Sequence, residues 1–565
     1  MTDFRHFSKI RYGNLTQKVE HSHTKTTGFM VWLRSFYKLA DKTAQAGGSA
    51  MYEDIMDKER HGESLLTHLC ALFAIPRASG NEGGAVAYAI HHALKREWSV
   101  FFQFLGIDAS GRLNGNVILQ VPPTPGYEHK PVVVLQAHLD IVGEKSAKST
   151  HDFLTDPIPA YLDAEGYIRS RNASTTLGVD NGWGVAAALA AGDDASYIHG
   201  PLELLFTISE ETGMDGAFAV HKEMLKGRIL LNLDSGSEKE CIFFVGCAGG
   251  GNTTITIPLL YKTVPVGYKP IRVKVQNFRG GHSGVDIHLH RQNAIKVLAK
   301  LITAAYYHKP KDAMISFCKG GSKNNAIPRE AEAEIWVLDD SNYEKKIVQC
   351  WNEMSINPDD CAKDEAGQTI APSVSIENIS FEKATQPLSN SCDILCLLNS
   401  LPHGWMVMSR DIPGKVETST NLAILNCEGD KLTILCSTRS FKSDQRDTLR
   451  VDIQCLGEIA GGHAEQNCEY PNWAPNLASP ILNMAKIVYK RINNKEPEVT
   501  AVHAGLECGV IRDLVPGIDS LSFGPHMMDE HTPNENHLVA SGQRSFDFLK
   551  ALLNAVAMDQ LQPRA

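Results

Sequence analysis

Histidines and carboxylates follow several apolar segments of this chain at spacings that suit metal binding. His138 and Asp140 end the segment Leu135-Gln-Ala-His-Leu-Asp. Because side chains alternate along a strand, both should point to one side at its carboxyl end, where open α/β sheets bind ligands. A metal-ligating histidine usually donates its second ring N–H to a carboxylate or similar acceptor. We therefore predict that His138 binds metal and that Asp140 orients it.

Two further motifs place acids in comparable positions. Asp180 lies in a Gly-rich turn before a helix of small residues, where its carboxylate could bridge two cations. Glu210 and Glu211 follow a predicted strand at 202–208. In extended geometry these two side chains would point in different directions. One can then bind metal while the other takes a proton from water, as hydrolysis at neutral pH requires.

Asp234 ends a third apolar strand, and His531 lies in a late loop rich in Pro and Gly. With the earlier motifs they complete a predicted ligand set of His138, Asp180, Glu211, Asp234 and His531. This N/O set suits zinc and is compatible with cobalt or manganese. Singly, each motif has a more ordinary explanation, such as a surface histidine, a helix cap at Asp180 or a solvated loop at the paired Glu. All five together favour a metal site.

The elements around these motifs indicate an α/β fold. Near-continuous apolar runs at 131–135 and 228–233 are typical of parallel strands covered on both faces. Alternation of strands with helices predicts a parallel-rich sheet with flanking helices in a discontinuous core domain. After residue 251 the pattern changes to an inserted α+β domain. The apolar spacing over 53–105 also predicts helices. Further helices are predicted at 217–225, 293–305 and 479–492, and further strands at 116–121, 253–257, 271–275, 331–337 and 521–523.

Composition excludes several classes of partner. The formal charge of −10 gives no positive field to attract nucleic acid or an anionic membrane surface. No apolar stretch approaches the roughly 18 residues of a membrane span. Thirteen cysteines without a CxxC pair indicate free thiols, most of them buried, in a reducing compartment, and a cytoplasmic location is expected. Residues 1–50 are basic and polar, which fits an N-terminal extension without order, a transit segment, or an upstream start with Met51 as the true beginning.

The order of the motifs HLD, GVDNG, SEETGMDGA, NLDS, GGHSG and GPHMMDEHTPNE resembles that of the aminoacyl-histidine dipeptidases (peptidase D, Xaa-His dipeptidase, carnosinase-like) among the co-catalytic zinc metallopeptidases and deacylases. The resemblance runs from about residue 60 to the C-terminus. It implies two divalent metal ions, most simply zinc, that are bridged by Asp180. His138 and Asp234 would complete one centre, and Glu211 and His531 the other.

The resemblance also implies roles for residues that do not bind metal. Asp140 would be the partner of His138, and Glu210 the general base that passes its proton to the leaving amine. In the inserted domain, which resembles the lid of the family, His282 would bind substrate and stabilise the oxyanion. The remaining candidates are Asn325 and Arg439 for the substrate's carboxylate, and Glu507 with His503 for its amino group, although a buried hydrogen bond at a helix start would explain the last two equally well.

The implied domains are a catalytic domain over 51–247 and 473–565 and a lid over 248–472. A lid that closes over the metals favours short substrates, and we expect dipeptides, including Xaa-His dipeptides of the carnosine type. An N-acyl amino acid deacylase or aminoacylase is an alternative that the motifs do not separate. A non-catalytic metal-pocket protein is a second alternative, which the presence of Glu210 disfavours. The resemblance further suggests a homodimer.

Overall fold

The computed structural model describes residues 10–13, 52–55, 63–239, 241–306, 313–339, 342–363 and 367–559. The chain divides into two compact units. Unit 1 comprises residues 1–245, 476–500 and 506–565, and unit 2 comprises residues 246–475 and 501–505. Within 1–50 only β1 (Ile10–Gly13) is described, and it pairs in parallel with β2. The interpretations of this segment as an extension, transit peptide or upstream start otherwise lie outside the described residues.

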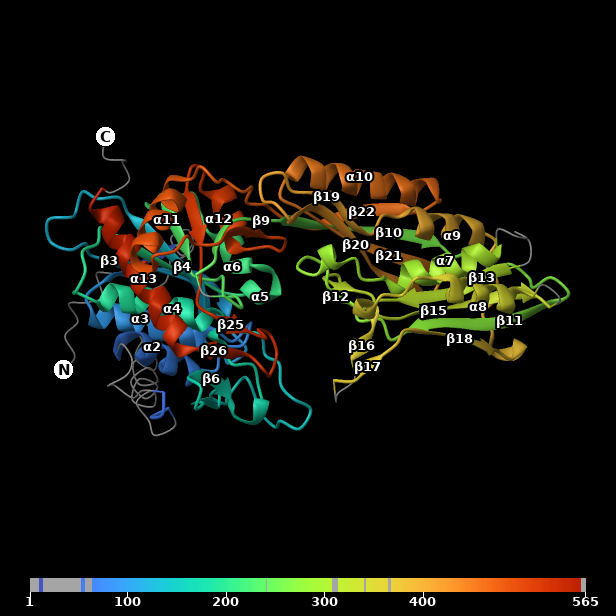
Figure 1. Cartoon of the computed structure of the whole chain (residues 1–565), viewed down its shortest axis with the longest axis horizontal. Coiled ribbons are helices and arrows are strands. Elements are labelled where there is room, and N and C mark those ends of the chain that lie inside the picture. The colour runs from blue at the N-terminus through green and yellow to red at the C-terminus, as the bar shows by residue number, and fades with distance from the viewer. Residues whose placement is uncertain are drawn as a thin grey trace, which may run out of the picture. The chain divides into compact units, whose positions relative to one another are not determined.

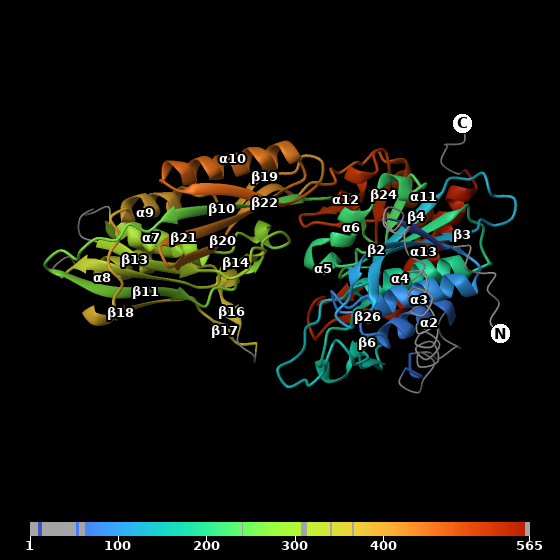
Figure 2. The same cartoon turned by 180° about the vertical axis from the view of Figure 1, so that it is seen from behind.

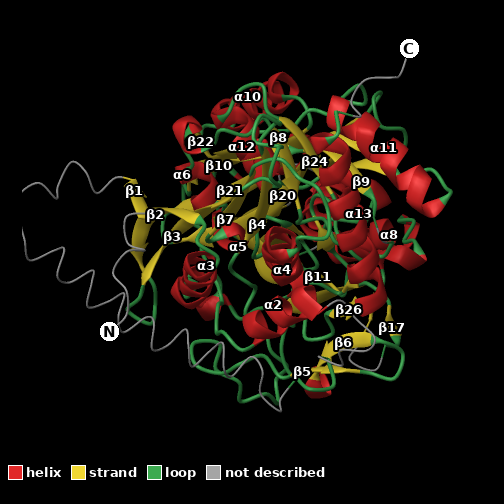
Figure 3. Ribbon diagram, turned by 90° about the vertical axis from the view of Figure 1, so that its left-hand side faces the viewer, coloured by secondary structure: helices red, strands yellow, loops and turns green. Residues whose placement is uncertain are grey.

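A nine-stranded sheet forms the centre of unit 1 (Figures 1 and 3). Its middle strands, β7, β4, β8 and β24, run parallel to one another. All six side chains of β4 and of β7 are buried, as their apolar runs predicted. The predicted α/β fold with a parallel-rich sheet is confirmed. In spatial order the strands are β1, β2 (Ser99–Ile107), β3 (Leu113–Val121), β7 (Leu202–Thr207), β4 (Val133–His138), β8 (Ile229–Asn232), β24 (Asp519–Ser522), β9 (Phe243–Cys247) and β23 (Val499–Val502).

Helices cover both faces of this sheet. Viewed along the layers, α2 (Glu63–Phe73), α3 (Gly83–Lys95) and α4 (Val179–Asp193) lie on one side, and α6 (Asp215–Ala219) and α12 (Glu507–Leu514) on the other (Figure 3). Turning the molecule by 180° shows the same stacking of α2, α3 and α4 (Figure 2). Two further helices, α11 (Pro480–Asn493) and α13 (Val539–Ala557), complete the helical layers of the unit.

Two predicted helical stretches are corrected. The helical spacing assigned to 53–105 ends with α3, because 99–107 forms β2, whose apolar side chains pair against β3. The predicted helix at 217–225 is broken: α6 ends at Ala219, and a separate 3-10 turn covers Lys222–Met224. Val220 and His221 between them have extended backbone angles, which interrupts the helical hydrogen bonds.

Unit 2 is built on a second, antiparallel sheet. Helices α7 (Ala294–Tyr306), α8 (Tyr343–Glu353), α9 (Ser391–Ser400) and α10 (Ser443–Ile459) pack on it. Side chains such as Val273, Leu298 and Ile335 form the apolar core. The strand order is β18 (Ser373–Asn378), β11 (Tyr268–Gln276), β15 (Ala331–Leu338), β13 (Ala313–Gly320), β20 (Val416–Glu428), β21 (Lys431–Ser440), β10 (Gly249–Pro258) and β22 (His463–Tyr470), with β19 (Gly404–Met408) on β20.

Two further expectations can be compared with the structure. None of the helices in the described ranges combines the length and apolar composition needed to cross a bilayer. All thirteen cysteines lie in these ranges as free thiols, but the expectation that most are buried is wrong, because only six of them are buried. A small antiparallel sheet of β25 (Met527–Met528), β26 (Asn536–Leu538), β6 (Tyr167–Ser170) and β5 (Ala160–Leu162) flanks the loop that carries His531.

Candidate metal centre

The carboxyl ends of β7, β4 and β8 lie side by side in unit 1. His138, the last residue of β4, pairs with Thr207 at the end of β7, and Gln136 pairs with Asn232 at the end of β8. Asp234 follows β8 by two residues. Parallel pairing therefore brings residues that are about 100 positions apart in the chain to one edge of the sheet.

Asp180 lies between the two histidines of the predicted set. Its Oδ1 is 3.2 Å from His138 Nε2, and its Oδ2 is 3.1 Å from His531 Nε2. The alternative interpretation of Asp180 as a cap of α4 is not supported, because its side chain contacts the histidines and the Gly184 N–H donates instead to Asn181 Oδ1, at 3.1 Å. Gly178 has φ of 75°, and a β-carbon there would meet Ile141 Cγ2 at 2.8 Å. Glycine is thus required for the turn that presents Asp180.

The other two carboxylates each join one of these histidines. Asp234 Oδ1 is 3.1 Å from His138 Nε2, and Glu211 Oε1 is 3.1 Å from His531 Nε2. Two triads result, His138–Asp180–Asp234 and Asp180–Glu211–His531, and within each the ligand atoms lie within 4.8 Å of one another. The side chain of His138 is 1% exposed and that of His531 50% exposed. One triad is therefore buried while the other opens to solvent at His531.

Asp140 supports the imidazole of His138. Its Oδ1 is 3.4 Å from His138 Nδ1, and the same ring nitrogen is 3.2 Å from the Asp140 carbonyl oxygen. Its carboxylate also accepts hydrogen bonds from the backbone N–H groups of Glu210, at 3.0 Å, and Glu211, at 3.1 Å. Asp140 thus orients the imidazole and fixes the turn that carries both glutamates.

Glu210 and Glu211 begin the short helix α5 (Glu210–Gly213). The extended geometry that we expected for them is wrong, because Ser209 adopts a left-handed conformation with φ of 56° and turns the chain into this helix. Both carboxylates still reach the site, since they form a third group with His138. Burial raises the pKa of Glu210 well above its ordinary value.

The electrostatics of the site favour cations. Burial, reinforced by the neighbouring charges of Asp180 and Glu211, raises the pKa of Asp234 to about 7. Burial and the charge of Asp180 also raise the pKa of Glu211. Buried carboxylates at such short range are costly unless they coordinate a cation or are paired. With imidazole nitrogens and carboxylate oxygens as donors, the residues fit divalent metal ions.

Two buried residues that sequence reasoning did not single out hold the Asp180 turn. Glu535 accepts backbone hydrogen bonds from Leu177 at 2.7 Å, Gly178 and Val179 at 2.8 Å each, and Asp180 at 3.3 Å. Arg77 donates to the carbonyl oxygens of Leu139, at 2.8 Å, and Gly178, at 2.5 Å, and so ties the end of β4 to the same turn. Glu535 stands four residues after His531 in a quoted motif, but only the fold reveals its partners.

We predict that Glu535→Gln weakens metal binding by about 10- to 100-fold, the usual cost of losing a residue that orients a metal ligand. The amide nitrogen of Gln would face backbone N–H groups that now donate to a carboxylate oxygen. Competition with a chromophoric chelator measures the affinity. The control is Glu165→Gln, which alters an exposed glutamate. Equal affinities in both variants would show that the turn does not depend on Glu535.

Three predicted substrate-binding residues lie in unit 2. His282 ends β12 (Gly281–His282), which pairs with β14 (Ala326–Ile327), and the Ser283 N–H donates to the Asn325 carbonyl oxygen at 2.8 Å. The structure thus brings the loops of His282 and Asn325 together. Arg439 lies on β21, with its side chain buried and its Nη1 donating to the Tyr470 hydroxyl at 2.6 Å.

Glu507 belongs to unit 1 and is fully buried at the start of α12. Its Oε2 accepts hydrogen bonds from the Thr207 hydroxyl, at 2.7 Å, and from the Gln136 side chain. Its Oε1 has no partner among the described residues. Burial raises the pKa of Glu507 to about 8. His503 lies in unit 2, where its Nε2 is 2.8 Å from the Ser419 hydroxyl.

Comparisons with known proteins agree with a peptidase fold. The model of peptidase family M28 matches residues 116–326. The cytosol non-specific dipeptidase of Escherichia coli (strain K12) is 36% identical over 443 residues, which cover 78% of this chain and 89% of that protein. The crystal structure of aminoacylhistidine dipeptidase from Vibrio alginolyticus is 32% identical with a TM-score of 0.73, and the match covers 90% of this chain and 99% of that one.

Proposed function

The chain belongs to the dipeptidase family that includes the cytosol non-specific dipeptidase of Escherichia coli, and we propose that it is a metal-dependent hydrolase of dipeptides. One observation carries the proposal: the two carboxylate oxygens of Asp180 face different histidines, His138 at 3.2 Å and His531 at 3.1 Å. A carboxylate with one oxygen in each of two donor triads is the arrangement expected of a bridge between two cations.

We assign one cation to His138, Asp180 and Asp234, and the other to Asp180, Glu211 and His531. Two imidazoles and three carboxylates suit zinc, with cobalt or manganese as alternatives. Asp140 is the residue that positions His138. Bound cations would polarise the scissile carbonyl and lower the pKa of water.

Glu210 is the proposed general base. Its carboxylate lies beside His138 and Glu211, and burial raises its pKa well above the ordinary value, which favours uptake of a proton from water. It takes the proton of the attacking water and delivers it to the nitrogen of the leaving amine. Asp140 accepts a hydrogen bond from the Glu210 backbone and also contacts the His138 imidazole, so one residue positions both the base and the metal ligand.

Unit 2 supplies the proposed lid and substrate contacts. Arg439 would bind the carboxylate of the dipeptide, and its buried Nε, which lacks a partner among the described residues, is a donor left over for that purpose. Asn325 would assist it, and His282 would stabilise the oxyanion. Glu507 would bind the amino group of the substrate through Oε1, the oxygen that has no partner among the described residues. Recognition of both ends of the substrate restricts hydrolysis to dipeptides.

A substrate panel on metal-stripped protein tests the proposal. We expect no turnover without added metal and restoration by zinc, manganese or cobalt. Xaa-His and other dipeptides should be cleaved faster than N-acetyl amino acids. Faster cleavage of N-acetyl amino acids would instead identify a deacylase, and no dipeptide turnover with any of the three ions would overturn the proposal. Hydrolysis is followed by release of free amino acids.

A further inference from the structure

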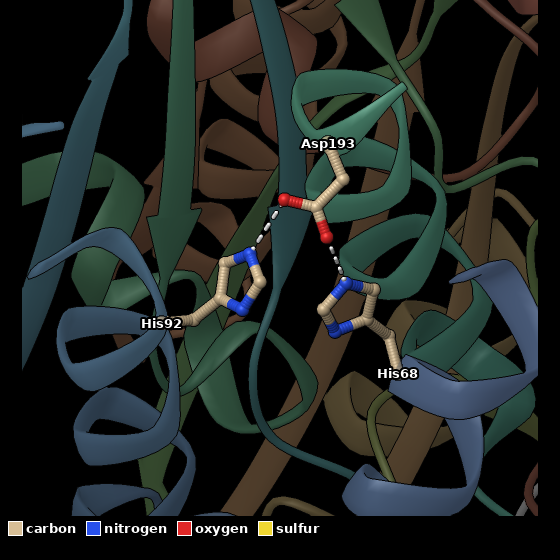
Figure 4. Close-up of side chains that lie close together, drawn as sticks. All are labelled: His68, His92 and Asp193. Atoms are coloured by element: carbon tan, nitrogen blue, oxygen red, sulfur yellow. Dashed lines mark hydrogen bonds and ion pairs between the residues drawn. The ribbon is translucent and has the colours of Figure 1, made fainter. Parts of the chain in front are cut away.

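A second group of side chains that could hold a metal ion lies in unit 1, outside the residues assigned above. It consists of His68 on α2, His92 on α3 and Asp193, the last residue of α4. Both imidazoles point at one carboxylate (Figure 4): His68 Nε2 is 3.1 Å from Asp193 Oδ2, and His92 Nε2 is 2.8 Å from Asp193 Oδ1. Three helices are thus joined at one point.

Neighbouring side chains hold both rings in place. The far nitrogen of His68, Nδ1, is 2.7 Å from the Tyr88 hydroxyl. A hydroxyl can donate or accept, so it supports His68 whether Nε2 carries a proton or a metal ion. His92 packs edge-on against Trp98, with ring centroids 5.4 Å apart, and against His68 at 4.7 Å. A partner on the second ring nitrogen is the usual arrangement of a histidine that binds metal.

The spacing of the donor atoms suits a small cation. All three ligand atoms lie within 4.8 Å of one another. Bonds of about 2.0–2.2 Å from zinc to N and O donors place neighbouring tetrahedral donors slightly farther apart than the Nε2–Oδ contacts seen here, so small side-chain shifts would admit an ion. The side chains of His68, His92 and Asp193 are 4%, 16% and 7% exposed.

A cavity adjoins Asp193. It has a volume of about 310 Å³ and is lined by Asp193 together with Ser64, Arg96, Phe546 and Lys550. A water molecule from this cavity can complete four-coordination, because the protein itself offers only three donors.

We propose that His68, His92 and Asp193 bind a zinc ion that fastens α2, α3 and α4 together. The donor set of two imidazoles and one carboxylate is one that zinc favours. Since a site of this kind exists only in the folded chain, the ion stabilises the native state through mass action.

The competing explanation is a network of hydrogen bonds in which both imidazoles donate to Asp193. Arg96 Nε also contacts Asp193 Oδ1, at 2.9 Å, and balances its charge. A carboxylate has about four acceptor positions, so Arg96 and a metal ion are compatible on the same group. The side chain of Arg96 is 50% exposed and can move aside. Zinc stoichiometry separates the two explanations.

The experiment counts zinc by plasma mass spectrometry in full-length protein that was loaded with excess zinc and freed of loose ions by gel filtration. We expect His92→Gln to contain one zinc ion fewer per chain than the wild type, and to gain less thermal stability from added zinc. Asp193→Asn, which preserves side-chain shape, is the second variant. The control is His91→Gln, which alters the adjacent buried histidine outside the group and should retain the ion.

The same comparison in an Asp180→Asn background separates this site from the metal centre. Adding His92→Gln to that background should again remove one ion per chain, whatever the centre retains. Equal zinc contents of the wild type, His92→Gln and Asp193→Asn would overturn the proposal and leave the hydrogen-bond network as the explanation. Loss of the ion in His91→Gln, in protein that remains folded by circular dichroism, would also overturn it.

Discussion

Glu210→Gln is expected to lower kcat for dipeptide hydrolysis by roughly 10³-fold, within the range attributed to a general base. Gln retains the size of Glu but cannot accept the proton of water. The backbone N–H of residue 210, which donates to Asp140, is unchanged. Metal content should therefore stay at the wild-type level while turnover is lost.

Steady-state kinetics and metal analysis of the same preparation test this expectation. Glu223→Gln is the control, because Glu223 is an exposed glutamate in the neighbouring 3-10 turn. It should behave as wild type. Retained activity in Glu210→Gln would show that the base is misassigned, whereas loss of bound metal would make Glu210 a ligand. Wild-type protein that binds metal but cleaves no dipeptide would favour the non-catalytic alternative.

The parts of the site that follow strand ends were predictable from the sequence. His138 ends β4 and Asp234 follows the end of β8 by two residues, and the parallel register of β4 and β8 brings His138 Nε2 within 3.1 Å of Asp234 Oδ1. The apolar runs that predict these strands also predict their burial, so strand type and position follow from one pattern. The pairing of Asp140 with His138 follows from alternation along the chain in the same way.

The conformations of the loops were harder to predict from the sequence. Asp180 was predicted in a turn, but the shape of that turn depends on Glu535, which is 355 residues away, and on Arg77. No local pattern predicts a carboxylate that accepts four backbone N–H groups from a distant loop. Glu210 and Glu211 were expected in extended geometry, because nothing in the sequence marks Ser209 for a left-handed conformation. Tertiary contacts decide both cases.

The strand β2 was missed for a different reason. Its sequence, Ser99 to Ile107, contains Val-Phe-Phe-Gln-Phe-Leu, which is apolar except for Gln103, and continues the apolar spacing of the preceding helices. Short apolar runs do not distinguish a helix from a strand by periodicity alone. Pairing with β3 decides the outcome, since it buries Val100 and Phe102 on the face that packs against α3.

Asp180→Asn should remove metal as well as activity. The amide of Asn offers one acceptor oxygen and a nitrogen that donates, so it can serve one triad but not both. Loss of a residue that merely orients a ligand costs about 10- to 100-fold in metal affinity, and the loss of a bridging ligand should exceed that. We expect the metal centre of this variant to hold at most one ion, with dipeptide turnover reduced by more than about 10²-fold.

The bridging role of Asp180 is tested by comparing Asp180→Asn with His531→Gln. Metal affinity is measured by chelator competition, and bound ions are counted in both variants. His531 contacts one oxygen of Asp180 and belongs to one triad, so its loss should weaken one ion and spare the other. Asp180→Asn should weaken both. Asp359→Asn, at an exposed position in unit 2, controls for the loss of a carboxylate as such. If Asp180→Asn bound both ions with wild-type affinity, the two triads would be independent and the bridging role of Asp180 would be wrong, because a shared ligand must couple the two sites.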